Sequence, residues 1–270
     1  MFDLVEKYGG WALITGASSG IGREFARYLA KINFNLILIA RRYERLLELS
    51  DELTNKYHIE ILCIKADLTK EECFPEIFEK VGEREVGLLV NNAGVGSIGF
   101  LFQLGLQKEI DLVKLNCLAP TILTHYFLKK MVERKKGAII FLGSIVGMQP
   151  TSYLSVYSAS KSFNIFFANA LWYELKKFNI DVLALSPGST NTEFERTSQD
   201  TSRIITAEPD KVVRTAFKAL GKKPTVVHGL INKILITIGK FLPGKVAVTL
   251  TGIISYNRNK KNKFVNYGKI

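Results

Sequence analysis

Short apolar runs alternate along the chain with longer segments whose apolar residues recur at helical spacing. The apolar runs cover residues 11–15, 35–40, 61–64, 87–90, 138–142, 181–186 and 225–228. Between the first two runs, Ile21, Phe25 and Leu29 recur every four residues, which indicates one face of a helix. Strands that alternate with helices are typical of an α/β fold. The pattern therefore predicts a doubly wound parallel sheet of about seven strands, with helices on both faces.

Nothing in the sequence marks a boundary between domains. The chain has 270 residues and contains no repeat, no low-complexity stretch and no linker rich in Pro or Gly. We therefore expect a single domain over residues 1–270. The three cysteines, Cys63, Cys73 and Cys117, cannot all pair, and the N-terminus has no secretory signal. Both features predict a cytoplasmic protein.

A glycine-rich turn follows the first predicted strand. Residues 16–22 read Gly-Ala-Ser-Ser-Gly-Ile-Gly and lead directly into the helical pattern. Glycines at such a turn allow the backbone to approach a pyrophosphate closely, and the free N–H groups of the helix start attract an anion. The turn therefore predicts a dinucleotide site, although a glycine-rich turn can also exist without a ligand.

Two arginines follow the second predicted strand. Arg41 and Arg42 stand where an acidic residue would bind the ribose 2′-hydroxyl of NAD, whereas an Arg there accommodates the 2′-phosphate of NADP. These residues predict NADPH/NADP+ rather than NADH, unless they are only the solvated start of a helix. Asp67 and Leu68, after the third strand, are in position to contact an adenine.

A possible proton donor lies in the second half of the chain. Tyr157 and Lys161 are four residues apart, so their side chains share one face if the segment from about Ser155 is helical. A neighbouring ammonium lowers the pKa of a phenol toward neutral pH. Ser144 follows a predicted strand, at the edge where open α/β sheets bind ligands. Alone, however, the Tyr-x-x-x-Lys spacing could equally be a solvated pair.

Taken in order, five motifs resemble the classical short-chain dehydrogenases/reductases. The motifs are residues 15–22, Asn-Asn-Ala-Gly at 91–94, Ser144, Tyr157-x-x-x-Lys161, and Pro187-Gly188 with Thr192 following. The resemblance covers about residues 8–195 and implies an NAD(P)-binding Rossmann-type domain. In such a domain, residues 191–270 would supply a substrate lid and a basic, apolar C-terminal extension. The implied reaction transfers hydride between a nicotinamide and a carbonyl or alcohol.

The resemblance also implies a role for individual residues. Tyr157 would be the general acid, Lys161 would lower its pKa and bind the ribose, and Ser144 would hydrogen-bond the substrate carbonyl. Asn116, in the helical segment predicted at 107–130, would complete a catalytic tetrad and support a proton relay. The cofactor would be held by Gly16, Ser18, Ser19, Gly20, Ile21, Gly22, Arg41, Arg42, Asp67, Leu68, Asn92, Ala93, Gly94, Tyr157, Lys161, Pro187, Gly188, Thr190 and Thr192.

The surroundings of Ser144 and Tyr157 predict a lipophilic substrate. They contain mainly apolar residues, namely Ile145, Val146, Met148, Pro150, Tyr153, Leu154 and Val156. A hydrophobic ketone and a 3-oxoacyl thioester of lipid synthesis both fit. A non-catalytic NADPH-binding scaffold or sensor is a further alternative. The family resemblance also implies a homodimer or homotetramer, with an apolar helix surface formed by Phe163, Phe166, Phe167, Ala170 and Leu171.

The net charge of +12 comes from the C-terminal part of the chain. Residues 211–270 contain 13 of the 37 Lys and Arg residues and no Asp or Glu, which leaves 24 basic residues against 25 acidic ones elsewhere. Within this part, residues 230–242 predict an apolar helix with one polar stripe, and 246–254 form a second apolar run.

Several partners fit this basic, apolar segment. It could cap the substrate pocket or pack between subunits, lie on an anionic membrane, or attract an acidic carrier or coenzyme A thioester. Nucleic acid is not expected, because the basic residues are interleaved with aliphatic ones. No metal is expected either, because His58, His125 and His228 lack metal-ligand spacing.

Overall fold

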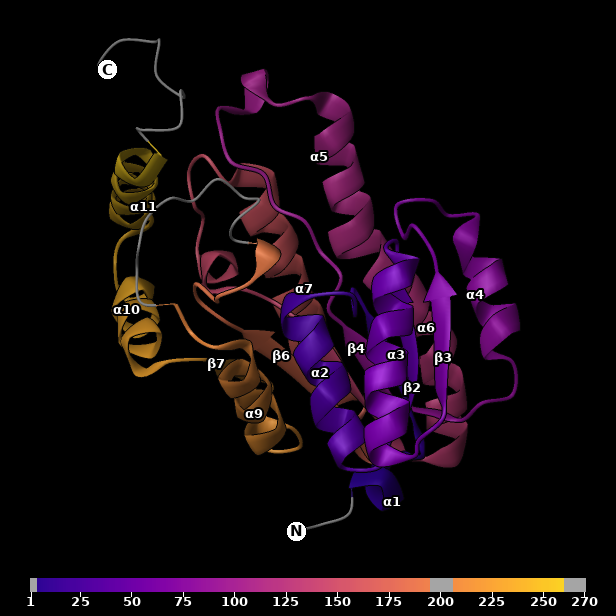
Figure 1. Ribbon diagram of the computed structural model, residues 1–270. Coiled ribbons are helices and arrows are strands. Elements are labelled where there is room, and N and C mark those ends of the chain that lie inside the picture. The colour runs from indigo at the N-terminus through magenta and orange to yellow at the C-terminus, as the bar shows by residue number, and fades with distance from the viewer. Residues whose placement is uncertain (1–3, 195–205, 260–270) are drawn as a thin grey trace.

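The computed structural model describes residues 4–194 and 206–259, and its centre is a parallel sheet of seven strands (Figure 1). The strand order is β3-β2-β1-β4-β5-β6-β7, and every neighbouring pair is parallel. The strands are β1 (Trp11–Thr15), β2 (Asn35–Ala40), β3 (Ile61–Lys65), β4 (Val86–Asn91), β5 (Gly137–Leu142), β6 (Ile180–Ser186) and β7 (Thr225–Val227). The predicted doubly wound fold is thereby confirmed.

Helices cover both faces of this sheet. They are α1 (Leu4–Tyr8), α2 (Gly20–Lys31), α3 (Tyr43–Tyr57), α4 (Cys73–Val81), α5 (Leu106–Val113), α6 (Ala119–Arg134), α7 (Ser155–Glu174), α9 (Pro209–Ala219), α10 (Leu230–Lys240) and α11 (Gly244–Asn259). Helices α2, α3 and α9 pack on one face, and α4, α6 and α7 on the other. Because the order reverses between β1 and β4, their carboxyl ends frame the crevice where such sheets bind ligands.

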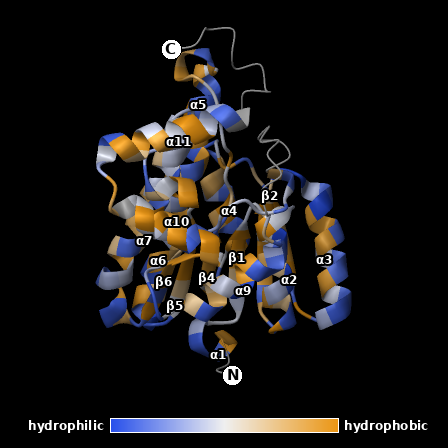
Figure 2. Ribbon diagram, turned by 90° about the vertical axis from the view of Figure 1, so that its left-hand side faces the viewer, coloured by the Kyte–Doolittle hydropathy of each residue, from blue (hydrophilic) through white to orange (hydrophobic). Residues whose placement is uncertain are grey.

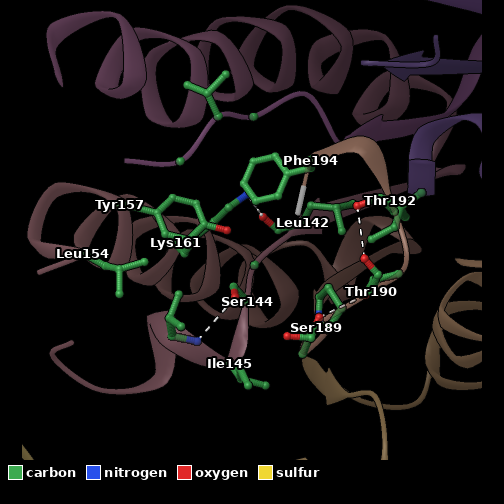
Figure 3. Close-up of a pocket in the computed structure, with 18 of the residues that line it drawn as sticks. Leu142, Ser144, Ile145, Leu154, Tyr157, Lys161, Ser189, Thr190, Thr192 and Phe194 are labelled. Atoms are coloured by element: carbon green, nitrogen blue, oxygen red, sulfur yellow. Dashed lines mark hydrogen bonds between the residues drawn. The ribbon is translucent and has the colours of Figure 1, made fainter. Parts of the chain in front are cut away.

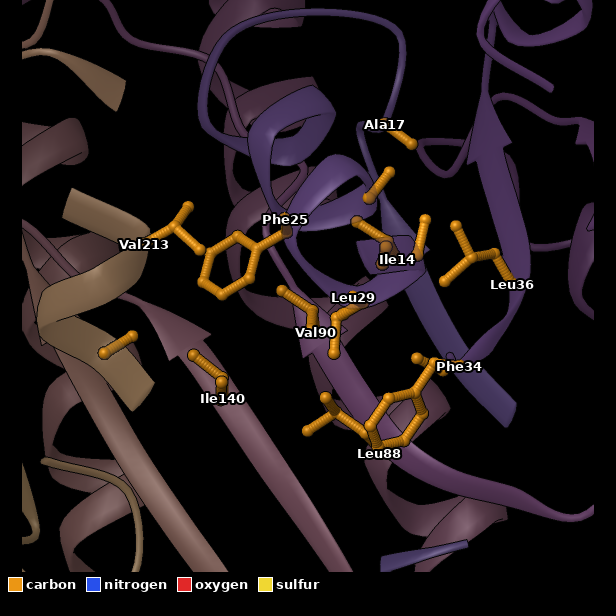
Figure 4. Packing of buried hydrophobic residues seen from close by; sticks show 14 of the residues in the cluster. Ile14, Ala17, Phe25, Leu29, Phe34, Leu36, Leu88, Val90, Ile140 and Val213 are labelled. Carbon is orange, nitrogen blue, oxygen red and sulfur yellow. The ribbon is translucent and has the colours of Figure 1, made fainter. Parts of the chain in front are cut away.

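The core consists of two clusters because strand side chains alternate between the faces. Leu13 and Ile14 are neighbours in β1, yet Leu13 packs beneath α4, α6 and α7 whereas Ile14 packs beneath α2 and α9. Figure 4 shows the second arrangement, in which Phe25 of α2 lies between the sheet and Val213 of α9. Continuous apolar runs are required here because both faces of the sheet are buried.

Two expectations about helices change in the structure. The helix predicted at 107–130 extends from Leu106 to Arg134 and is interrupted by a π-helical turn at Lys114–Leu118. On α7, Phe163, Phe166 and Ala170 are exposed, as the predicted subunit surface requires. Phe167 and Leu171 are not part of that surface. They pack against the core cluster on the sheet side, where the Phe167 ring lies 5.2 Å from the ring of Phe141 in β5, measured between centroids.

Helices α10 and α11 stand at the β7 edge of the molecule (Figure 1). The helix predicted over 230–242 is present as α10, and the second apolar run is part of α11. The predicted break at Pro243-Gly244 separates the two helices. In the part of the chain that the structure describes, no helix has the length and apolar character needed to span a bilayer.

Candidate functional site

The glycine-rich turn connects β1 to α2 in a conformation that needs its glycines. Gly16 has φ of 66°, in the left-handed region. At Gly22, an added Cβ would lie 2.4 Å from the carbonyl oxygen of Gly16 and 2.4 Å from Nδ2 of Asn92. The turn is thus packed against the segment that follows β4, and its backbone faces the cavity directly.

The Asn-Asn-Ala-Gly segment is fixed to the turn by hydrogen bonds. Thr15 Oγ1 accepts from the backbone N–H groups of Asn92 and Ala93, at 3.0 and 2.9 Å. Asn92 Nδ2 donates in return to the carbonyl oxygen of Thr15, at 2.8 Å. Asn92 therefore joins the carboxyl ends of β1 and β4. A side chain at position 94 would crowd Lys161, since a Cβ added to Gly94 would lie 3.3 Å from Nζ of Lys161.

Arg42 connects the glycine-rich turn with the segment after β6. Its Nη2 donates to Oγ of Ser19 at 2.7 Å and to Oγ of Ser18 at 3.2 Å. Its Nη1 forms an ion pair with Glu193 at 2.7 Å. Hydrogen bonds from Arg42, and then from Arg45, hold the pKa of Glu193 below its usual range. Arg41 is exposed and also lines the cavity.

Tyr157 and Lys161 lie one turn apart on α7, as the sequence predicts. The ammonium nitrogen of Lys161 is 5.9 Å from the centroid of the Tyr157 ring and donates to the carbonyl oxygen of Leu142 at 2.9 Å. Lys161 is almost fully buried. Burial lowers its pKa to about 8, because desolvation disfavours the charged form, and Cys117 acts weakly in the opposite direction.

Ser144 follows β5 directly and caps the short 3₁₀ turn Ile145–Met148. Its Oγ accepts from the backbone N–H of Val146 at 3.4 Å. The N–H of Ile145 donates to the carbonyl oxygen of Pro187 at 3.0 Å, which ties the ends of β5 and β6 together. Because the contact to Val146 uses an oxygen lone pair, the O–H of Ser144 can donate toward the cavity.

Asn116 is fully buried in the π-helical turn, behind the cavity wall. Its Oδ1 accepts from the N–H of Val95 at 3.0 Å, and its Nδ2 donates to the carbonyl of Val95 and to Oγ of Ser160, both at 2.9 Å. Ser160 donates in turn to the carbonyl of Tyr157 at 2.7 Å. Asn116 therefore couples the loop after β4 to the helix that carries Tyr157, and π-helical turns are frequent at functional sites.

One cavity of about 800 Å³ brings these residues together. Every predicted site residue lines it except Gly22 and Asn116, which lie behind its wall. At the far end the lining becomes apolar, through Leu154, Phe194, Leu235, Ile238, Leu250 and Ile254. Figure 3 shows the Phe194 ring beside Tyr157, with 6.0 Å between the two ring centroids.

Sequence reasoning identified only part of this lining. Ile145, Val146 and Leu154 line the cavity as predicted, whereas Met148 packs against the core. Glu193 and Phe194 were not predicted. Helices α10 and α11 do line the cavity, in agreement with the alternative that this segment caps the substrate pocket. Glu193 directly follows the predicted Thr192 in the sequence. This neighbouring position was the only signal that could have indicated Glu193 as a site residue.

Comparison with known proteins places this arrangement in a family. A family model described as short chain dehydrogenase matches residues 10–203. The chain belongs to the short-chain dehydrogenase family. Members act on the CH–OH/C=O pair with a nicotinamide cofactor, and this oxidoreductase carries the family's motifs in order.

Two curated relatives resemble this short-chain dehydrogenase over most of its length. A Bos taurus protein named very-long-chain 3-oxoacyl-CoA reductase is 31% identical over 263 residues, covering 94% of this chain and 84% of the relative. A Homo sapiens protein named inactive hydroxysteroid dehydrogenase-like protein 1 is 31% identical over 264 residues, covering 96% and 80%.

Solved structures agree with the fold of this short-chain dehydrogenase. A structure from a study of 7beta-hydroxysteroid dehydrogenase stereoselectivity has a TM-score of 0.86 at 24% identity, covering 92% of this chain and 98% of the other. A short-chain dehydrogenase from Sphingobium yanoikuyae in complex with NADPH has a TM-score of 0.76 at 28% identity, covering 86% and 96%.

Proposed function

We propose that this short-chain dehydrogenase is an NADPH-dependent reductase of a bulky, lipophilic ketone. The observation that carries the proposal is the cavity, which runs from Arg42 past Tyr157 and Ser144 to an apolar wall built from α10 and α11. A cationic end suits a phosphate, and an apolar end suits a hydrocarbon. The proton donors lie between the two.

The residues of this chain fit a dinucleotide. The turn at 16–22 offers backbone N–H groups and room that a Cβ would fill, and it leads into the N-terminus of α2. Ser18, Ser19 and Arg42 form a donor cluster suited to a 2′-phosphate. Asp67 and Leu68 would contact the adenine, and Pro187, Thr190 and Thr192 the carboxamide. A bound nicotinamide would supply the hydride.

In reduction, the protein's task is to stabilise charge on the carbonyl oxygen. Tyr157 donates its phenolic proton to that oxygen, and the Ser144 hydroxyl donates a hydrogen bond to it. Lys161, held by the carbonyl of Leu142, places a positive charge beside the phenol and favours its ionised product. Asn116 fixes the helix that carries Tyr157 and supports the relay that returns a proton.

The apolar wall supports a large hydrophobic substrate rather than a sugar. Residues from α10 and α11 form that wall and act as the substrate lid expected of residues 191–270, of which 195–205 lie outside the described residues. In this proposal the protein is one NAD(P)-binding domain, cytoplasmic, and a homodimer or homotetramer. Exposed Phe163 and Phe166 on α7 support the oligomer.

Two alternatives follow from the relatives' names. Similarity to a very-long-chain 3-oxoacyl-CoA reductase favours a 3-oxoacyl thioester, whose acyl chain would occupy the same apolar wall. Similarity to a protein named inactive favours a non-catalytic NADPH-binding scaffold. The presence of Asn116, Ser144, Tyr157 and Lys161 together argues for catalysis.

The test is NADPH consumption across a carbonyl panel. The panel contains steroid and long-chain ketones, 3-oxoacyl thioesters, small aldehydes and sugars. We expect turnover of one lipophilic class, lost in Tyr157→Phe and retained in Tyr173→Phe, a matched change at an exposed position on the same helix. NADPH binding without turnover of any substrate would favour the scaffold and reject the proposal.

A further inference from the structure

We propose that helices α10 and α11 form a docking surface for an anionic lipid bilayer, through which the substrate reaches the cavity. The two helices stand at the edge of the molecule in Figure 1, and Figure 2 shows them from outside, with α10 largely in the hydrophobic colour and α11 in a mixture of hydrophobic and hydrophilic colours. The docking itself is independent of the proposed function. The route by which the substrate reaches the cavity, in contrast, rests on the proposed function.

Helix α10 turns its most apolar face away from the protein. Six large apolar residues recur along this face at helical spacing and are all more than half exposed: Leu230, Ile231, Ile234, Leu235, Ile238 and Phe241. The face toward the protein carries Asn232, which donates to the carbonyl of His228, Gly239, which packs against Gln149, and a single half-buried large apolar residue, Ile236, which lines the cavity. An amphipathic helix packed on a core has the opposite orientation. The outward apolar face therefore needs another apolar environment.

Helix α11 continues the same surface. Val246, Leu250, Ile253 and Ile254 are exposed, whereas Ala247, Thr251 and Ser255 are buried against the body of the protein. Thr251 anchors the helix by donating to the carbonyl of Pro150 at 3.0 Å. This apolar area adjoins that of α10 in sequence and across the cavity, which both helices line. Contiguous apolar patches of this kind mark protein or membrane contacts.

Charge decides which partner fits. Exposed Lys233 and Lys245 accompany the apolar face, and residues 211–270 contain no acidic residue. A second copy of the chain would place like charges against each other. An acidic soluble protein would match the charge but offers fewer apolar partners. An anionic bilayer matches both, because basic side chains remain with the headgroups while aliphatic ones enter the acyl boundary.

The cavity opens toward this surface. Leu235, Ile238, Leu250 and Ile254 are exposed and also line the cavity wall. An apolar molecule dissolved in the bilayer could therefore move between these side chains into the site without crossing water. Given the proposed function, this geometry assigns the substrate class as membrane-dissolved ketones or acyl chains.

The test compares vesicles of phosphatidylcholine with vesicles that also contain phosphatidylserine. We expect the purified protein to sediment with the anionic vesicles and to remain in the supernatant with the neutral ones. Ile234→Asp places a charge in the exposed face, outside the cavity lining, and is expected to weaken binding about tenfold or more. Leu47→Asp, at a similarly exposed position on α3, is expected to leave binding unchanged.

A charge reversal tests the electrostatic part separately. Lys233→Glu is expected to weaken binding about fivefold, whereas Lys129→Glu on the exposed part of α6 leaves it unchanged. Equal sedimentation with both kinds of vesicle, or none with either, would overturn the proposal. So would a dimer of the wild type that Ile234→Asp converts to monomer without any vesicle binding.

The substrate route has its own readout. With a lipophilic ketone delivered in anionic vesicles, Ile234→Asp is expected to lower the rate about tenfold while leaving kcat/KM for a water-soluble ketone unchanged. A variant that loses vesicle binding but keeps the rate on vesicle-borne ketone would overturn the route. Absence of turnover by the wild type would reject the proposed function and leave the docking result standing.

Discussion

Glu193 forms ion pairs with both Arg42 and Arg45, each with a 2.7 Å contact. The two arginines lie at the start of α3, whereas Glu193 lies in the segment after β6. Its carboxylate therefore occupies one side of the arginine that we expect to bind the 2′-phosphate. Glu193 links cofactor recognition to the segment that also carries Phe194, which lies beside Tyr157.

Removing the Glu193 charge is expected to strengthen NADPH binding. In Glu193→Gln, the N–H groups of Arg42 no longer bind the Glu193 carboxylate and are available to the 2′-phosphate of NADPH. Since exposed ion pairs contribute about 0.2–1 kcal/mol, we expect the Kd for NADPH to fall by a factor of about 1.4 to 5 while that for NADH is unchanged. Fluorescence titration measures both constants. Glu52→Gln, which removes the exposed partner of Arg27, is the control, and weaker binding of both cofactors by Glu193→Gln would contradict this role.

Arg42 is expected to contribute more to cofactor preference than Arg41. Only Arg42 donates to Ser18 and Ser19 among the described contacts, so its guanidinium is held at the glycine-rich turn. Arg42→Ala should weaken NADPH binding about tenfold, and Arg41→Ala by a smaller factor. The ratio of dissociation constants for NADPH and NADH tests this. A ratio that is unchanged in both variants would show that these arginines do not determine the preference for NADPH.

The burial of Lys161 predicts a pH dependence of the reductase reaction. The pKa of Lys161 is lowered to about 8, so the free enzyme loses this positive charge as the pH rises through that value. Because the protonated form supports Tyr157, kcat/KM for reduction should be maximal below about pH 8 and fall above it. A profile from about pH 6 to about pH 10 tests this. Lys161→Met should be slow at every pH, and a wild-type profile flat through pH 8 would contradict the assignment.

Gly22 is expected to tolerate no side chain. In Gly22→Ala the new Cβ would collide with the backbone of Gly16 and with Asn92, each at 2.4 Å, so the turn must shift. We expect a loss of about 1–3 kcal/mol in the free energy of unfolding, together with weaker NADPH binding. Urea unfolding measures the first effect. Gly10→Ala is the matched control, because nothing lies within 4 Å of its added Cβ. Equal stability of the two variants would contradict the packing argument.

The sequence determined the elements and the local chemistry. Buried strands, amphipathic helices, the glycine-rich turn and the one-turn spacing of Tyr157 and Lys161 all depend on residues close together in the chain. Such features follow from local geometry, so periodicity and spacing are sufficient to predict them. The alternation of strands and helices predicted the parallel sheet, and the order of the motifs indicated the family.

The tertiary structure decided what depends on contacts between distant residues. The ion pair between Arg42 and Glu193 joins positions 151 residues apart, and no local pattern indicates it. On α7 the sequence showed apolar residues on several sides, and only packing turned Phe167 inward and left Phe166 exposed. On α10 the sequence likewise showed an apolar face, but not whether that face points toward the protein or away from it. Direction is set by the anchoring of Asn232 and Gly239 against the protein, which forces the apolar face outward.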